Sequence, residues 1–131
     1  MNGFVENIEK ATLSNRDFRR VLYTGKNSQL VLMSLKASEE IGSEVHKTHD
    51  QFFRFESGEG LVVIDDKKTK VKDGTAVIVP AGAKHNVINT GESELKLYTI
   101  YSPPEHMDKV VRHTKKEALA SEEHFDGKTT E

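Results

Sequence analysis

Cysteine and tryptophan are absent from this chain of 131 residues, and proline occurs three times. The absence of cysteine excludes disulfide bonds, thiolate metal ligands and a cysteine nucleophile. It is also typical of the reducing cytoplasm, where structural disulfides are rare. Any chemistry in this chain must therefore use histidine, carboxylate, amide or hydroxyl groups.

An excess of charge of one sign and long apolar runs are also lacking. The 19 Lys and Arg residues nearly balance the 21 Asp and Glu residues, which gives a formal charge of −2. A nucleic-acid-binding domain typically has a basic excess, and a membrane-spanning helix needs roughly 18–20 apolar residues. The first ten residues, MNGFVENIEK, carry acids where a signal peptide has basic and then apolar residues. We therefore expect a cytoplasmic protein that binds neither nucleic acid nor membrane.

The length and composition predict one domain with a modest core. A chain of this size forms one domain, and its residues are 35% apolar and 31% charged. Apolar runs recur about every 10–12 residues from Leu30 to Ser102, a spacing typical of an all-β sandwich or barrel. We expect a single domain over 1–131, with the barrel over about 28–102 and a tail with a short helix over about 103–131.

Local signals indicate where these elements begin and pair. The segments 51–56 and 61–65, joined by the glycine-bearing segment 57–60, are typical of a β-hairpin. Scattered apolar positions in residues 1–25 predict short strands. Thr114 followed by Glu117 is a capping-box pattern, which predicts the N-terminus of a helix.

The segment GTAVIVPAGAKHNVIN has polar and turn-forming residues at characteristic positions. Gly74 makes the turn into a strand, Pro80 ends that strand, and Gly82 permits a tight reversal. His85 begins the next strand, where its imidazole can face the mouth of a barrel, and Asn89 follows four residues later.

An upstream segment carries a second spaced set. Six residues separate Gln51 from Gly58, four separate Gln51 from His46, and Glu44 lies two residues before His46. Together the two segments resemble the two motifs of the cupin superfamily, with Glu44 in place of a histidine and Gln51 in place of a glutamate. The resemblance covers roughly residues 30–102. The wider chain is similar to small single-domain bacterial cupins, often labelled mannose-6-phosphate isomerase-like.

The resemblance implies an all-β cupin jelly-roll barrel with a divalent metal ion near its mouth. It assigns the metal to Glu44, His46, Gln51 and His85, which offer two imidazoles, one carboxylate and one amide oxygen. Such donors suit Zn, Fe, Ni, Mn or Co, and no sulfur ligand narrows the choice. His49 is an alternative ligand because it lies two residues before Gln51. Each of these side chains could instead form ordinary hydrogen bonds in a loop or in the core.

Three functions are compatible with such a site. The first is a metal-dependent isomerase or lyase that acts on a small sugar or keto-acid substrate, with the metal polarising a carbonyl group. The glutamine in place of glutamate also resembles small cupins that open unsaturated uronate sugars. The alternatives are a metal-dependent dioxygenase and a non-catalytic module that binds or senses a small ligand.

Strand parity predicts which side chains line the barrel. If Gln51 faces inward, Phe53 and Phe55 face inward too, while Phe52 and Arg54 face outward. An outward Phe52 indicates sheet-to-sheet packing in a homodimer, an assembly that the family resemblance also implies. Arg54 either binds an anionic substrate group or forms a surface salt bridge.

The acid–base groups of an enzyme would come from the same region. We expect Glu44, when it does not bind the metal, and Tyr98 to act in catalysis. Tyr101 is the alternative to Tyr98, since the two residues lie on opposite faces of one strand. His106 either approaches the mouth of the barrel or lies exposed in the tail.

Overall fold

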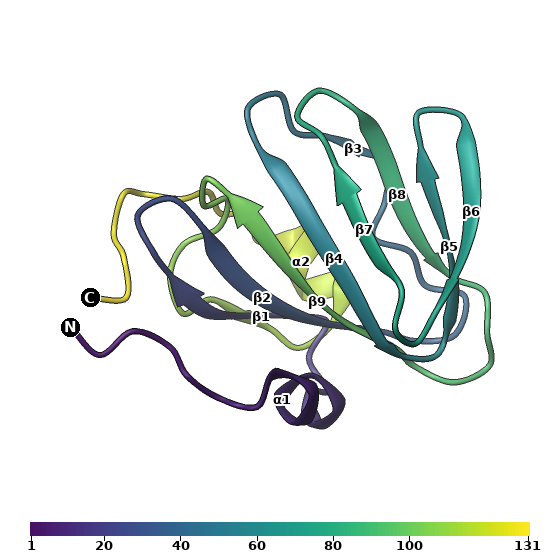
Figure 1. The fold of residues 1–131 in the computed structure, drawn as a ribbon, viewed down its shortest axis with the longest axis horizontal. Coiled ribbons are helices and arrows are strands. Elements are labelled where there is room, and N and C mark those ends of the chain that lie inside the picture. The colour runs from purple at the N-terminus through teal and green to yellow at the C-terminus, as the bar shows by residue number, and fades with distance from the viewer.

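The computed structural model describes residues 1–131 as two antiparallel sheets that pack face to face (Figure 1). The six-stranded sheet has the order β10-β1-β2-β9-β4-β7. Its strands are β1 (Arg19–Thr24), β2 (Gln29–Leu35), β4 (Asp50–Ser57), β7 (Ala76–Val79), β9 (Leu95–Ser102) and β10 (Val111–Arg112). The four-stranded sheet has the order β3-β8-β5-β6. Its strands are β3 (Glu44–Val45), β5 (Glu59–Ile64), β6 (Lys67–Lys72) and β8 (Lys84–Asn89).

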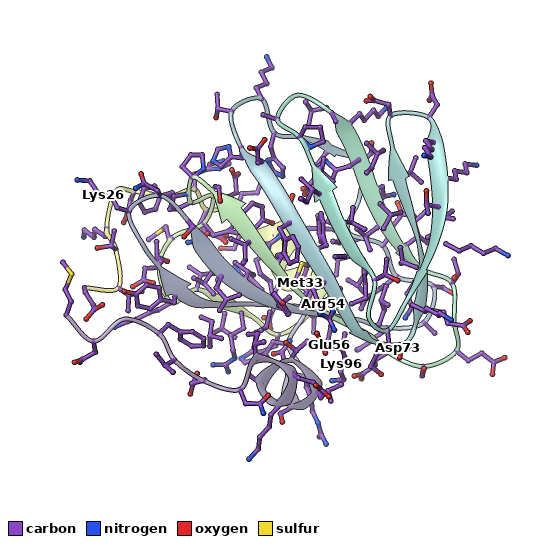
Figure 2. All side chains as sticks on the ribbon, in the orientation of Figure 1. Lys26, Met33, Arg54, Glu56, Asp73 and Lys96 are labelled. Carbon is purple, nitrogen blue, oxygen red and sulfur yellow. The ribbon has the colours of Figure 1, made fainter.

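The core lies between the two sheets and follows strand parity. Phe53 and Phe55 on β4 are 0% exposed, and Leu95 and Leu97 on β9 are equally inaccessible. Burying each such side chain contributes about 2 kcal/mol relative to leaving it exposed. Met33 completes this layer from β2 (Figure 2). The expected all-β jelly-roll fold is therefore confirmed, and so is the inward orientation of the two phenylalanines.

The chain passes from one sheet to the other at Gly58, and this makes the expected hairpin over 51–65 wrong. Strand β4 pairs with β7 and β9, whereas β5 pairs with β6 and β8. Gly58 adopts φ +94°, and a Cβ on it would lie 2.7 Å from the carbonyl oxygen of Glu94. The glycine therefore makes a crossover between sheets, because its backbone fits a space that no side chain can enter.

Two short helices flank the sheets. Helix α1 (Ile8–Ser14) is capped at its N-terminus by Asn7, whose side chain accepts a hydrogen bond from the Lys10 amide. The short strands expected in residues 1–25 are confirmed for β1 and wrong for residues 8–14, where the N-cap and the burial of Thr12 favour a helix. Helix α2 (Lys115–Ala120) begins at Thr114, whose hydroxyl accepts from the Glu117 amide, as the capping-box pattern predicts.

The C-terminal segment returns across the molecule after α2. The Phe125 amide donates to the Glu105 carbonyl at 2.8 Å, and the Thr130 amide donates to the Thr24 carbonyl at 2.9 Å. The amides of Asn2 and Gly3 bind the Glu131 carboxylate, so the two termini lie close together (Figure 1). Neither helix is long and apolar enough to cross a membrane.

Candidate metal centre

Three of the expected ligands meet where the four-stranded sheet faces β4 and β9. Glu44 on β3 lies directly opposite His85 on β8, and His46 follows β3 immediately. Each of these side chains offers a ligand atom, and the three atoms lie within 4.8 Å of one another. The ring centroids of His46 and His85 are 5.3 Å apart. The β3–β8 pairing thus joins residues that are 41 positions apart in the sequence, counted as 85 minus 44.

His85 presents a free ring nitrogen to this cluster. Its Nδ1 lies 3.3 Å from the carbonyl oxygen of Ala83, whereas its Nε2 is buried and has no hydrogen-bonding partner. Burial also lowers the pKa of His85, since it disfavours the charged form. A neutral imidazole that donates from Nδ1 to a carbonyl has its lone pair on Nε2, which is the arrangement of a metal-binding histidine.

Gln51 has a free oxygen in the same region. Its side chain is buried on β4, and its Nε2 donates to the Thr99 hydroxyl at 3.0 Å. Its Oε1 is buried without a partner. Gln51 lies opposite Tyr101 in the β4–β9 pairing, and the Tyr101 ring centroid is 5.7 Å from that of His46. The hydrogen bond from Gln51 Nε2 to Thr99 fixes the orientation of the side-chain amide, so Oε1 remains available as a metal ligand.

Glu44 and His46 form a charge-assisted pair. His46 Nε2 lies 3.1 Å from Glu44 Oε2. Burial alone would raise the pKa of Glu44, but its hydrogen bond and charge interactions with His46 lower the pKa below its ordinary value. The same hydrogen bond raises the pKa of His46. A divalent cation that binds both side chains would replace this contact, because metal ligands bind in their deprotonated form.

His49 lies on the other side of His46 and belongs to a second group with Glu105. His49 Nε2 is 3.1 Å from the Pro104 carbonyl oxygen and 3.2 Å from Glu105 Oε2. Glu105 Oε2 is also 3.7 Å from His46 Nδ1. Glu105 therefore orients both imidazoles, and His49 is outside the group formed by Glu44, His46 and His85.

The expected position of Tyr98 is wrong, because this side chain lies on the outer face of the six-stranded sheet. Its ring packs against Phe52, with centroids 6.1 Å apart. Tyr101 is the tyrosine that faces the cluster, and it is buried. On the outer face, Arg54 forms an ion pair with Glu56 at 3.3 Å, away from the cluster (Figure 2).

A cavity of about 160 Å³ opens beside the cluster and is covered by the C-terminal segment. It is lined in part by Arg19, Tyr101, Glu105, His106 and Glu123 as well as by Glu44 and His46. His106 is buried, and its Nε2 lies 3.3 Å from the Tyr101 hydroxyl, so it approaches the mouth of the barrel. Sequence reasoning missed Arg19, Glu105 and Glu123, since they lie in strands or tails outside the two motifs.

The match to a family model agrees with this geometry. Residues 31–101 match the model described as "Cupin domain", and the match spans more than half of the chain. The chain therefore belongs to the cupin family, as the two motifs indicate.

Three relatives extend the comparison. The uncharacterized protein YrkC of Bacillus subtilis (strain 168) is 48% identical over 126 residues, which cover 92% of this chain and 68% of YrkC. The uncharacterized protein L612 of Acanthamoeba polyphaga mimivirus is 42% identical over 107 residues, covering 79% of this chain and 67% of L612. The crystal structure of BH2720 from Bacillus halodurans has a TM-score of 0.90 at 46% identity, covering 92% of this chain and 96% of that one. These descriptions state no activity, so the mannose-6-phosphate isomerase-like label remains a prediction.

Proposed function

We propose that this cupin binds a divalent metal ion through Glu44, His46, Gln51 and His85. The observation that carries the proposal is the pair of buried, unpartnered atoms at the cluster, His85 Nε2 and Gln51 Oε1. Leaving a buried polar atom without a partner costs about 1–3 kcal/mol, and a bound cation would remove that cost at both atoms. The donor set of two imidazoles and two oxygens fits Zn, Fe, Ni, Mn or Co.

The proposed reaction is an isomerase or lyase step on a small sugar or keto acid. The bound ion would act as a Lewis acid toward a carbonyl or hydroxyl oxygen of the substrate. Glu105 would orient His46 through Nδ1, from which it is 3.7 Å away. Burial raises the pKa of Tyr101, so its phenol stays protonated and acts as a hydrogen-bond donor.

Metal analysis of protein purified without chelator tests this function. We expect about one equivalent of a transition metal in the wild type and none in the double variant His46→Ala, His85→Ala. His113→Ala is the matched control, since its side chain is 68% exposed and lies outside the cluster. Full metal content in the double variant would refute the proposed ligands. Screening the loaded protein with sugars and keto acids then tests turnover, and oxygen uptake would instead indicate a dioxygenase.

The outer face of the six-stranded sheet supports a homodimer as the proposed assembly. Phe52 lies between Ile78 and Ile100 in the strand pairing, and Ile78 is 68% exposed. Apolar side chains on an exposed sheet face favour packing against a second sheet. Sedimentation should show a dimer that Ile78→Lys dissociates, and a monomeric wild type would contradict this assembly. The cytoplasmic location expected from the sequence also remains a proposal.

A further inference from the structure

Two arginines lie directly opposite each other at the edge of the six-stranded sheet. Arg19 of β1 pairs with Arg112 of β10. Their side chains are 13% and 22% exposed. Like charges directly opposite across two strands destabilise a sheet, and partial burial strengthens their repulsion. An anion between the two arginines would offset this repulsion.

Glu123, which follows α2 in the C-terminal segment, supplies that anion. Its Oε1 lies 3.6 Å from Arg19 Nη1 and its Oε2 lies 3.2 Å from Arg112 Nη2. Its Oε1 is also 3.3 Å from Nδ1 of His106. The Glu123 side chain is 5% exposed, so a tail residue carries its carboxylate into a recess formed by two arginines and a histidine.

The fit of this carboxylate in the recess is poor. Two buried arginine nitrogens of the cluster, Arg19 Nε and Arg112 Nε, have no hydrogen-bonding partner, and Glu123 Oε1 has only the 3.3 Å contact with His106 Nδ1 and lies 3.6 Å from Arg19 Nη1. A well-placed carboxylate accepts two parallel hydrogen bonds from an arginine, and buried polar groups in folded proteins are nearly always satisfied. Glu123 therefore offsets the positive charge of the recess but leaves hydrogen-bond donors of the two arginines unsatisfied.

The recess is continuous with the candidate metal centre. The cavity of about 160 Å³ is lined by Arg19, His106 and Glu123 at one part and by Glu44 and His46 at another. A molecule in this cavity would meet both a cationic recess and two of the proposed metal ligands, Glu44 and His46. Such a molecule needs an anionic group together with an oxygen that a metal can bind.

We propose that Arg19, Arg112 and His106 form a carboxylate-binding subsite, which the Glu123 side chain occupies in this structure. A small organic acid displaces Glu123 from this subsite and directs a carbonyl or hydroxyl oxygen toward the metal centre. This assignment rests on the proposed metal function and restricts its substrate to carboxylates. Apart from the Glu123 ion pairs, the hydrogen bonds that hold residues 121–125 are the one from the Phe125 amide to the Glu105 carbonyl and the one from the Arg112 side chain to the Ser121 carbonyl, so displacement of Glu123 breaks no helix or strand pairing.

Calorimetric titration with acetate and pyruvate, with acetamide as the neutral control, tests the subsite in the full-length chain. In Glu123→Gln the carboxylate that competes for the subsite is gone. If Glu123 leaves the subsite open about a tenth of the time in the wild type, acetate and pyruvate should bind the variant about tenfold more tightly than the wild type. Glu122→Gln is the matched control, since Glu122 also lines the cavity but has no ion pair with the arginines. Adding Arg112→Gln to Glu123→Gln should abolish carboxylate binding.

Amide hydrogen exchange of the wild type gives a second readout that does not depend on how the variants fold. Saturating pyruvate should speed the exchange of residues 121–126, because their anchor is displaced. Equal affinities in Glu123→Gln and Glu122→Gln, or tail exchange that pyruvate leaves unchanged or slows, would overturn the subsite.

Running the titrations in chelator and again with zinc separates this inference from the metal function. If the protein binds carboxylates in the presence of chelator but takes up no zinc when zinc is added, the subsite is supported and the metal function is refuted. Zinc uptake without a gain in carboxylate affinity on Glu123→Gln would overturn the subsite and leave the metal function standing.

Discussion

Two buried glutamines of the six-stranded sheet differ in how well their polar atoms are satisfied, and this difference predicts opposite mutational effects. Gln29 and Gln51 are 1% and 2% exposed. Gln29 makes four hydrogen bonds: its Nε2 donates to the Thr24 hydroxyl and the His106 carbonyl, and its Oε1 accepts from the amides of Glu105 and His106. Gln51 makes one hydrogen bond, and its Oε1 has no partner.

Replacing each glutamine by methionine keeps the side chain close to its length and removes the amide. In metal-free Gln51→Met, the loss of an unsatisfied buried oxygen gains about 1–3 kcal/mol and the lost hydrogen bond to Thr99 costs about 1 kcal/mol. The variant should therefore be more stable than the wild type by about 1 kcal/mol. Gln29→Met should be less stable by about 3–5 kcal/mol, because buried backbone amides lose their acceptor.

Urea denaturation in chelator and in excess zinc measures both effects. In zinc, Gln51→Met should lose at least about 1.4 kcal/mol of the stabilisation that zinc gives the wild type, equivalent to a tenfold weaker affinity. Destabilisation of metal-free Gln51→Met by more than about 2 kcal/mol, or undiminished stabilisation by zinc, would refute the reasoning that the free oxygen of Gln51 serves a metal.

Three further predictions concern other parts of the fold. Gly58→Ala should lower the free energy of unfolding by about 2 kcal/mol or more, because Gly58 has φ +94° and its new Cβ would lie 2.7 Å from the Glu94 carbonyl oxygen; an unchanged urea midpoint would contradict the crossover geometry. Burial lowers the pKa of His106 from 6.5, so below pH 6.5 the unfolded chain binds more protons, and the metal-free protein should lose up to about 1.4 kcal/mol per pH unit. His106→Gln should flatten this dependence, and equal slopes in the two proteins would refute it. Tyr101→Phe should cost about 1 kcal/mol because it removes the contact with His106 at 3.3 Å, whereas Tyr98→Phe on the outer face should change stability by less than about 0.5 kcal/mol; a larger loss for Tyr98→Phe would argue against this placement.

The strands and the inward-facing residues of β4 could be predicted because their signals are local. Alternation along one strand relates Gln51 to Phe53 and Phe55 without any knowledge of what the strand pairs with. The turn residues around His85 are equally local, and the structure places this histidine at the start of β8 as expected.

Features that depend on pairing between distant segments were not predicted. Parity separated Tyr98 from Tyr101, but only the β4–β9 register, which places Gln51 opposite Tyr101, shows which tyrosine faces the cluster. The segments flanking Gly58 look like a hairpin locally, yet each finds its partners in a different sheet. The contribution of Glu123 could not be predicted because the adjacent Glu122 and Glu123 lie in a polar tail, and the sequence does not show which of them contacts the arginines.

Anomalous X-ray scattering from crystals of protein purified without chelator tests the central claim most directly. Data collected at transition-metal absorption edges should show one peak about 2.0–2.3 Å from an imidazole nitrogen of each of His46 and His85 and from a side-chain oxygen of each of Glu44 and Gln51. Crystals soaked in excess zinc that show no peak at this position, or a peak that does not touch His85, would contradict the account.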